Sequence, residues 1–326
     1  MEAASLLVGD IGGTNVRFAL ASAGVERPRL ESVMQLRCAE FPGLAEAALH
    51  FLERSEAQRP QQALLAVAAP VTGDRVRITN NPWTFSVGAT ADALGLSLRV
   101  VNDFAAVSRA LPLLRGEELA PIGPLPSSRS STRQVYAVLG PGTGLGVSGL
   151  IAEGGRMTVI ESEGGHMDFA PIDATEAEVL RLVAERHGRV SAERLVSGMG
   201  IVNVYHALCE IAGRPSQADS AEQVAVLAGR DPEGLAAQAL DRVCAMLGSF
   251  AGDIALAFGA WQGVFLHGGV AQKLLPRLQR GAFRQRFETK GRHAPLMRAV
   301  PTQLILHPQA GLLGAAALGL QAASSG

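Results

Sequence analysis

The stretch that decides the fold is Leu6-Leu7-Val8-Gly9-Asp10-Ile11-Gly12-Gly13-Thr14-Asn15-Val16-Arg17-Phe18-Ala19-Leu20. The apolar run before the glycines and the alternation of apolar and polar residues after them predict two strands. Gly12-Gly13 permits positive φ and lets backbone N–H groups approach an anion, while Thr14 and Asn15 add short polar donors. We therefore predict a β-hairpin whose turn holds nucleotide phosphates. The alternative is an ordinary glycine hairpin with a solvated aspartate, since short glycine motifs recur by chance.

A second glycine hairpin follows in the later half of the chain. Val135–Leu139 and Val147–Ala152 read as strands on either side of the glycine-rich turn Gly140–Gly146. Two such turns would hold a triphosphate by backbone N–H groups, Gly12 to Asn15 on one and Gly142, Thr143 and Gly144 on the other. Gly144–Gly149 also satisfies GxGxxG, but strand-like sequence follows it where a dinucleotide site needs a helix. A nicotinamide-binding fold is therefore disfavoured.

Length and composition limit the class of protein. With 326 residues, two domains are the default, and the cleft between them is the natural ligand site. The 29 basic and 30 acidic residues almost balance, which disfavours nucleic acid and membrane surfaces as partners. The chain has only two lysines, Lys273 and Lys290, and neither follows a glycine, which excludes the GxxxxGK[ST] phosphate loop.

Cysteine usage and the amino terminus point to a cytoplasmic protein. Cys38, Cys209 and Cys244 are widely spaced, so we expect neither a disulfide framework nor a zinc site but buried thiols in a reducing compartment. No signal peptide precedes the first strand, and the apolar stretch Gly311–Leu320 is too short to cross a bilayer.

In the first half, the order of β-hairpin, helix, strand, helix and strand predicts an α/β layer with a largely parallel sheet. Gly116–Arg133, rich in Pro, Ser and Gly, is expected to be a loop near the domain boundary. Strands are expected at Leu64–Pro70, Leu98–Val101 and Val264–His267, and helices at Phe41–Leu52, from Asp103 to near Pro112, at Glu176–His187, at Val202–Ala212, at Leu235–Phe258 and after Gly311.

Asp103 is a candidate ligand-binding residue. It stands where an apolar strand ends and a helix begins, at the carboxyl edge of a parallel sheet, where ligands bind in such folds. Its alternative role is a helix N-cap, which is common for aspartate.

Several polar residues are suited to a polyhydroxylated ligand. Asn102 can both donate to and accept from a hydroxyl, and the glycine-flanked pair Glu163 and His166 is hard to explain as core. Glu193 can equally be a capping or surface carboxylate, and Asn81 can be part of a plain Asn-Pro turn. Gly268-Gly269 would let the backbone pack against adenosine, or form a tight structural turn.

Six ordered blocks carry a family resemblance over nearly the whole chain: DIGGTNVRFAL, VVNDFAAVSRAL, LGPGTGLGVSGL, ESEGGHMDFAP, SAERLVSGMGIVNVY and LHGGV. They resemble the bacterial ATP-dependent glucokinases, sugar kinases of the actin/hexokinase type. The related repressor–kinase family usually carries a cysteine-rich zinc motif after the histidine of the sugar site. Here Asp168-Phe-Ala-Pro follows, which is similar to the zinc-free group.

The resemblance implies a two-domain α/β fold of the actin/hexokinase (ribonuclease H-like) class with an interdomain cleft. It implies a small domain of residues 1–112 plus about 307–326 and a large domain of residues 113–306, assembled as a homodimer. It implies ATP and glucose as ligands, with Mg²⁺ carried on ATP and assisted by Asp10 through water. The residues it assigns are Asp103 as general base; Asn81, Asn102, Asp103, Glu163, His166 and Glu193 around the hexose; and Asp10, Gly12, Gly13, Thr14, Asn15, Gly142, Thr143, Gly144, Gly268 and Gly269 around ATP.

Two alternatives stay open from the residues. One is a kinase of the same fold for another hexose, such as mannose or an amino sugar, because polar residue types do not reveal an epimer. The other is a sugar sensor without catalysis, against which stand the presence of Asp103 and the lack of room for a DNA-binding module before Asp10.

Overall fold

The computed structural model describes residues 6–55, 58–79, 81–126 and 131–323. Packing separates the chain into two compact units, residues 1–115 with 307–326 and residues 116–306. The domain limits inferred from the sequence, 112/113 and about 306/307, stay a prediction. We call these parts the first and the second unit.

The first unit is built on one sheet, which holds five strands among the described residues, in the order β3, β2, β1, β4, β7. The bounds in that order are Arg29–Arg37, Asn15–Ser22, Leu6–Ile11, Gln62–Val67 and Ser97–Asn102. The pair β1–β2 is antiparallel, which confirms the hairpin expected from the opening sequence. β1–β4 and β4–β7 are parallel, so Ile11, Val67 and Asn102 share one row at the carboxyl edge.

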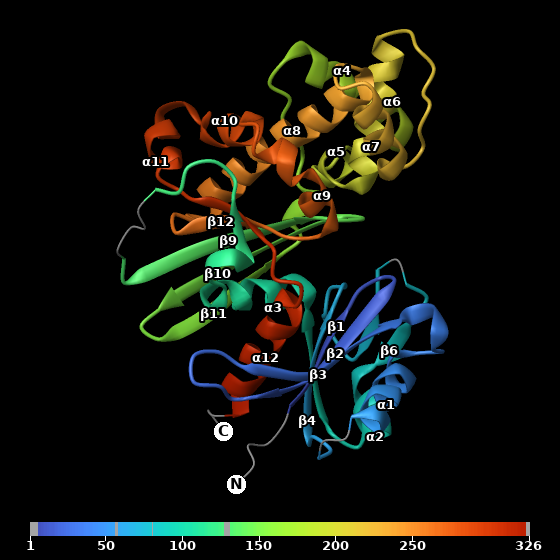
Figure 1. The fold of residues 1–326 in the computed structure, drawn as a ribbon, viewed down its shortest axis with the longest axis vertical. Coiled ribbons are helices and arrows are strands. Elements are labelled where there is room, and N and C mark those ends of the chain that lie inside the picture. Colours follow the sequence, from blue (N-terminus) through green and yellow to red (C-terminus); the bar gives the residue numbers. More distant parts are fainter. Residues whose placement is uncertain (1–5, 56–57, 80, 127–130, 324–326) are drawn as a thin grey trace. The chain divides into compact units, whose positions relative to one another are not determined.

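Both faces of β1 are buried, which explains its nearly continuous apolar sequence. Leu7 and Ile11 face a cluster that includes Phe51 of α1, whereas Leu6 and Val8 face a cluster that includes Leu312 of α12. The helices are α1 (Leu44–Arg54), α2 (Val87–Leu94), α3 (Asp103–Ala110) and α12 (Ala310–Ala323), with a small ribbon of β5 (Arg75–Arg77) and β6 (Thr84–Ser86). The helices α3 and α12 lie side by side (Figure 1).

The second unit repeats the strand order of the first. Its described strands form a six-stranded sheet in the order β11, β10, β9, β12, β13, β8. The bounds in that order are Arg156–Ser162, Leu145–Glu153, Arg133–Pro141, Gly263–Leu266, Thr302–Ile305 and Leu119–Pro121. As in the first unit, two antiparallel pairs are followed by two parallel ones, and β8 adds an antiparallel edge strand.

Helices cover this second sheet and enclose the largest described cluster of buried apolar side chains. They are α4 (Ala174–His187), α5 (Glu193–Val196), α6 (Gly198–Ile211), α7 (Ala221–Arg230), α8 (Leu235–Phe258), α9 (Gly269–Leu278), α10 (Ala282–Glu288) and α11 (Ala294–Arg298). The long helix α8 has the bounds expected from its sequence. None of the helices in the described ranges has the length and apolarity needed to cross a membrane.

Two expectations from the sequence were wrong in detail. Gly116–Arg133 is not all loop, because its described part contains a 3-10 turn at Gly116–Glu118 and strand β8; residues 127–130 lie outside the described ranges. The strand β3 is missing from the expected order, since most of its side chains are exposed and form no apolar run. The sequence of Gly12-Gly13 permits positive φ, but neither residue is among the described glycines with positive φ, so the first turn does not use the left-handed region.

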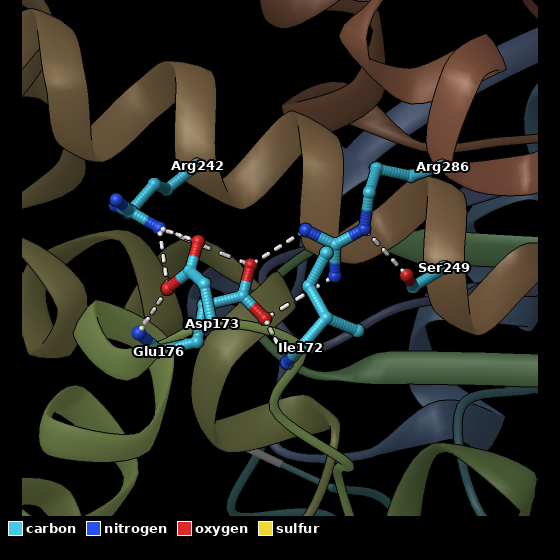
Figure 2. A network of polar contacts seen from close by, with 6 residues as sticks. All are labelled: Ile172, Asp173, Glu176, Arg242, Ser249 and Arg286. Carbon is cyan, nitrogen blue, oxygen red and sulfur yellow. Dashed lines mark hydrogen bonds and ion pairs between the residues drawn. The ribbon is translucent and has the colours of Figure 1, made fainter. Parts of the chain in front are cut away.

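A buried ion network ties helices of the second unit together (Figure 2). The side chain of Glu176 in α4 is fully buried, and its carboxylate accepts two hydrogen bonds from Arg286 of α10, at 2.7 and 3.2 Å. It also accepts from the N–H of Ile172 at 3.0 Å, and Arg286 donates to Ser249 of α8 at 2.9 Å. Because every polar atom of Glu176 has a partner, the buried charge is tolerated.

Candidate active site

The first glycine turn spans Gly12–Thr14, between β1 and β2. It closes on itself, since Gly12 N–H donates to the carbonyl of Asn15 at 3.0 Å, and Cys38 N–H donates to the carbonyl of Thr14 at 2.9 Å. Among the described residues, no acceptor takes the N–H of Gly13 or Thr14. These two donors are therefore available to an anion, as the phosphate interpretation of the sequence requires.

Asp10 lies on β1, two residues before this turn. Burial raises the pKa of its carboxyl group, and the guanidinium of Arg17, 3.7 Å from Oδ2, opposes that rise only in part. The start of α12 leaves no room around it, because a Cβ on Gly311 would stand 2.8 Å from Asp10 Oδ2. Gly311 thus helps to set the position of this carboxylate, a role that no local sequence pattern signals.

Asn81 supports the first turn from behind. Its side-chain oxygen accepts the N–H of Trp83 at 2.8 Å, and its Nδ2 donates to the carbonyl of Gly12 at 3.5 Å. The residue is buried, and Cys38 Sγ shares the same Gly12 carbonyl at 3.7 Å. Asn81 is therefore held next to the phosphate turn, and its contact with a sugar stays a prediction.

Asn102 and Asp103 stand at the carboxyl end of β7, where α3 begins. Asn102 Oδ1 accepts the N–H groups of Phe104 and Ala105 at 2.9 and 3.3 Å, so the N-cap of α3 is Asn102 and not Asp103. Asn102 Nδ2 donates to the carbonyl of Ala69 at 3.2 Å, which leaves one N–H of the amide to donate elsewhere. Capping by Asn102 spares Asp103, the first helical residue, from that structural role.

Asp103 is partly exposed and has a defined orientation. Its Oδ1 accepts the N–H of Phe104 at 2.9 Å, and the helix that it begins, α3, packs against α12. In the sheet, β7 pairs with β4 and β4 with β1, so Asp103 follows the row that contains the last residue of β1, Ile11. The candidate base and the first glycine turn are therefore brought to one edge of one sheet.

The second glycine turn, Gly142–Gly144, joins β9 and β10. Gly142 N–H donates to the carbonyl of Gly144 at 2.8 Å, whereas no acceptor among the described residues takes the N–H of Thr143 or Gly144. Thr143 is exposed at the tip. This turn thus offers the same kind of anion site as the first, from a hairpin of the same topology.

Glu193, at the start of α5, contacts this turn directly. Its Oε2 accepts the N–H of Leu145 at 2.9 Å, and a Cβ on Gly144 would overlap the same oxygen. The carbonyl of Leu145 is equally crowded, because a Cβ on Gly165 would overlap it. On the far side, Gly198 N–H at the start of α6 donates to the carbonyl of Gly142 at 2.8 Å.

Glu163 directly precedes the 3-10 turn Gly164–His166, and His166 is its last residue. Both side chains are exposed and, within the described ranges, neither has a hydrogen-bond partner. The backbone is tied down, since Arg189 Nη2 donates to the carbonyl of His166 at 2.6 Å and pairs with Asp168 at 2.8 Å. Ala192 N–H donates to the carbonyl of Met167 at 2.8 Å, which places the segment before Glu193 alongside this loop.

Gly268 and Gly269 follow β12 and begin α9. Gly268 has a φ of 100°, and a Cβ there would lie 3.1 Å from the carbonyl of Pro141, at the end of β9. A glycine is therefore required by conformation and by its closeness to the second hairpin. A Cβ on Gly269 would meet nothing within 4 Å, so that residue is open to a ligand.

The structure thus brings the candidate residues together in two groups. The first unit holds Asp10, Gly12, Gly13, Thr14, Asn15, Asn81, Asn102 and Asp103, and the second unit holds Gly142, Thr143, Gly144, Glu163, His166, Glu193, Gly268 and Gly269. Sequence reasoning missed the residues that support them: Cys38, Leu145, Gly165, Arg189, Gly198 and Gly311. Only the glycines gave a signal, and it did not say what they contact.

Comparisons with known proteins identify the family. A protein-family model described as Glucokinase matches residues 7–322. A curated glucokinase from Stenotrophomonas maltophilia (strain K279a) is 46% identical over 318 residues, covering 96% of this chain and 94% of that protein.

Solved structures agree with the sequence comparison. The crystal structure of a glucokinase from an Antarctic psychrotroph has a TM-score of 0.87 and 35% identity, covering 96% of this chain and 98% of that one. A glucokinase from Balamuthia mandrillaris, in complex with glucose, has a TM-score of 0.75 over 97% of this chain and 93% of that one; at 20% identity it shows the fold alone. These similarities confirm the two-domain actin/hexokinase-like fold expected from the sequence. The chain belongs to the glucokinase family and is therefore an ATP-dependent hexose kinase.

Proposed function

We propose that this chain transfers the γ-phosphoryl group of ATP to the 6-hydroxyl of glucose, giving glucose 6-phosphate and ADP, with Asp103 as the general base. The observation that carries the proposal is the position of Asp103. Asn102 takes the N-cap of α3, and Asp103 is left partly exposed at the sheet edge that also ends in the first glycine turn. Family membership supports glucose as the acceptor, and a glucokinase of the same fold holds glucose in its crystal structure.

Asp103 acts on the proton of the 6-hydroxyl. Its carboxylate accepts that hydrogen bond and orients the oxygen for in-line attack on the γ-phosphorus. The O–P bond to the 6-oxygen forms as the bond to the β-γ bridging oxygen breaks, and the proton passes to Asp103. Because the transition state is loose, most of the gain comes from orientation.

The backbone N–H groups of both glycine turns supply the phosphate contacts. Gly13 and Thr14 in one turn, and Thr143 and Gly144 in the other, carry donors that no described residue uses. Preorganised donors of this kind stabilise charge on the phosphate oxygens without reorganisation during the reaction. This arrangement explains how a chain with two lysines can bind ATP without a lysine-containing phosphate loop.

The residues near the first turn fit a magnesium ion that arrives with ATP. Asp10 offers one partly exposed carboxylate beside the turn, and Mg²⁺ prefers phosphate oxygens, water and one or two carboxylates. We assign Asp10 to this ion, with water between them. When bound, the ion would neutralise charge on the phosphates.

Hexose hydroxyls would be recognised by side chains that keep unused hydrogen-bonding capacity. Glu163 and His166 are exposed without a described partner, Glu193 retains Oε1, and Asn102 retains one N–H. Asn81 would approach from the first turn, and Gly268 and Gly269 would contact adenosine.

We place the activity in the cytoplasm, where free buried thiols such as those of Cys38, Cys209 and Cys244 persist.

A hexose panel tests the proposal. ADP formation is measured with MgATP and glucose, mannose, galactose, fructose or glucosamine, with no sugar as the blank. The proposal expects the highest kcat/KM with glucose. A clear preference for another hexose would reassign the substrate within the fold, and no ADP formation with any sugar would contradict the kinase mechanism.

A further inference from the structure

The contact between Glu193 and the second glycine turn joins two functions that the proposed mechanism keeps separate. Glu193 is assigned to the hexose, whereas Gly144 and Leu145 belong to the hairpin that holds phosphate. Yet Glu193 Oε2 accepts the N–H of Leu145 at 2.9 Å, and it fills the space where a side chain on Gly144 would begin. All of these atoms belong to the second unit, so the contact lies within one compact part of the chain.

We propose that Glu193 is a positioning residue for the phosphate turn as well as a hexose ligand, so that binding of the sugar and of the ATP phosphates is energetically coupled through the Leu145 N–H. This inference rests on the proposed function and adds to it a route of communication. The carboxylate holds the turn with one oxygen and is free to accept a sugar hydroxyl with the other.

The chemistry of a carboxylate favours such a double role. A charged acceptor makes a stronger hydrogen bond to a backbone N–H than a neutral one, and a sugar hydroxyl on Oε1 fixes the rotamer that keeps Oε2 on Leu145. The two contacts share the entropic cost of ordering the Glu193 side chain. Whatever sugar gains from a fixed turn, the nucleotide gains equally from a bound sugar, because coupling between two sites is reciprocal.

The surroundings of the turn make the coupling specific. The 3-10 turn between Glu163 and His166 packs through Gly165 against the carbonyl of the same residue, Leu145. The helix α5, which Glu193 begins, ends at Val196, and Gly198 at the start of α6 donates its N–H to the Gly142 carbonyl at 2.8 Å. The segments that carry the assigned sugar ligands therefore touch the turn from two sides, at Leu145 and at Gly142.

Two glycines of the turn provide a matched experiment. In Gly144→Ala, the new methyl group would overlap Glu193 Oε2 and push the carboxylate away, whereas in Gly142→Ala the methyl group would meet nothing within 4 Å. Glucose affinity is measured by calorimetry without nucleotide. We expect Gly144→Ala to weaken glucose binding about tenfold and Gly142→Ala to change it less than about twofold, within the usual range of site coupling. Equal glucose affinity in the two variants would overturn the inference.

The reverse direction is read on the nucleotide side without sugar. Glu193→Ala removes the acceptor for Leu145 N–H, whereas Glu193→Gln keeps an oxygen that can accept it. Binding of the non-hydrolysable ATP analogue AMPPNP with Mg²⁺ should weaken about fivefold or more in Glu193→Ala and recover in Glu193→Gln. A residue that only binds sugar would leave this affinity unchanged in both variants, and that result would contradict the coupling.

A double variant distinguishes coupling through the Glu193–Leu145 contact from a general perturbation of the turn. In the Glu193→Ala background there is no carboxylate to displace, so adding Gly144→Ala should cost no further glucose affinity. Additive losses would mean that the two residues act independently. If the unaltered chain forms no ADP with any hexose, the proposed function fails; if it phosphorylates glucose but these variants behave independently, only the coupling fails.

Discussion

At the scale of single residues, the position of a functional carboxylate depends on the side chains of its neighbours. Asp10 sits where the start of α12 has no side chain, because a Cβ on Gly311 would stand 2.8 Å from Oδ2 and 3.2 Å from Oδ1. Asp103 does not serve as the N-cap of α3, because the preceding residue, Asn102, caps the helix. Gly311 has no side chain that would displace Asp10, and Asn102 uses its own side chain as the helix cap in place of Asp103.

Substitution of Gly311 should therefore act through Asp10. We expect Gly311→Ala to lower kcat/KM for MgATP by up to about a hundredfold, because an ångström-scale displacement of a functional group costs that much. The KM for glucose should change little. Steady-state kinetics with each substrate varied in turn measures both effects.

The matched control is Gly229→Ala in α7, where the new methyl group meets nothing within 4 Å. It should leave all kinetic constants unchanged and stabilise the helix by about 0.5–1 kcal/mol. Unchanged MgATP kinetics in Gly311→Ala would refute the positioning of Asp10 by α12.

The raised pKa of Asp10 also has a consequence for stability. Burial raises the pKa above the ordinary 3.8, so the folded chain binds this proton more tightly than the unfolded chain does. The free energy of unfolding then falls as pH rises through the window that starts at the unfolded pKa. Asp10→Asn removes the desolvated charge, and we expect a higher Tm at pH 7 together with a loss of activity.

Thermal unfolding of both proteins between about pH 4 and pH 8 measures this effect. The gain in Tm should shrink towards the acid end, where the wild-type carboxyl is protonated. A gain that is constant over this range, or a Tm below wild type at pH 7, would be inconsistent with a carboxylate that burial penalises.

At the scale of elements, the sequence predicts a helix or strand well where the element has an apolar pattern of its own. It predicts poorly those elements that form only through contacts with neighbouring strands. The long helix α8 and the hairpin β1–β2 have patterns that stand on their own. The strand β3 is mostly exposed, and β8 and β13 have three and four residues, so only pairing within the sheet makes them strands. The two glycine turns could be predicted because the strands on either side of them have clear apolar patterns.

The candidate site shows the same limit. Its residue types stand in recognisable local blocks, but the contacts that hold them join distant positions. Glu193 meets Leu145, Gly311 meets Asp10, and Gly165 meets the carbonyl of Leu145, in each case across many residues of sequence. No periodicity or spacing connects such pairs, and only the folded chain reveals them.

The buried network of α4 supplies a prediction at this scale. Glu176→Ala would leave Arg286, paired at 2.7 Å and mostly buried, without its counter-charge. We expect a loss of about 3–5 kcal/mol in the free energy of unfolding, because breaking a buried pair leaves an uncompensated charge. Chemical denaturation measures it.

Glu185→Ala on the same helix is the control. Glu185 pairs with Arg181 on the exposed surface, where an ion pair contributes at most about 1 kcal/mol. Similar decreases in the free energy of unfolding in the two variants would show that the buried Glu176 network contributes no more than a surface ion pair.

At the scale of the whole molecule, two units of the same strand order each provide a glycine turn and a set of polar side chains. The binding of glucose should raise the stability of the folded chain by about 2.7 kcal/mol at a hundred times its Kd. Differential scanning calorimetry with and without sugar measures the shift, and an inactive hexose from the panel serves as the blank. No shift at a glucose concentration that saturates turnover would contradict specific binding. The homodimer implied by the family resemblance stays a prediction, which light scattering tests.

The most direct test of the central claim is a comparison of the unaltered chain with Asp103→Asn in two assays. The substitution keeps the shape of the side chain and removes the base. The account predicts that kcat falls by about 10²–10⁴-fold, while the Kd for glucose, measured by calorimetry without nucleotide, stays within a few-fold of wild type. Undiminished turnover in Asp103→Asn would contradict the assignment of Asp103 as the general base.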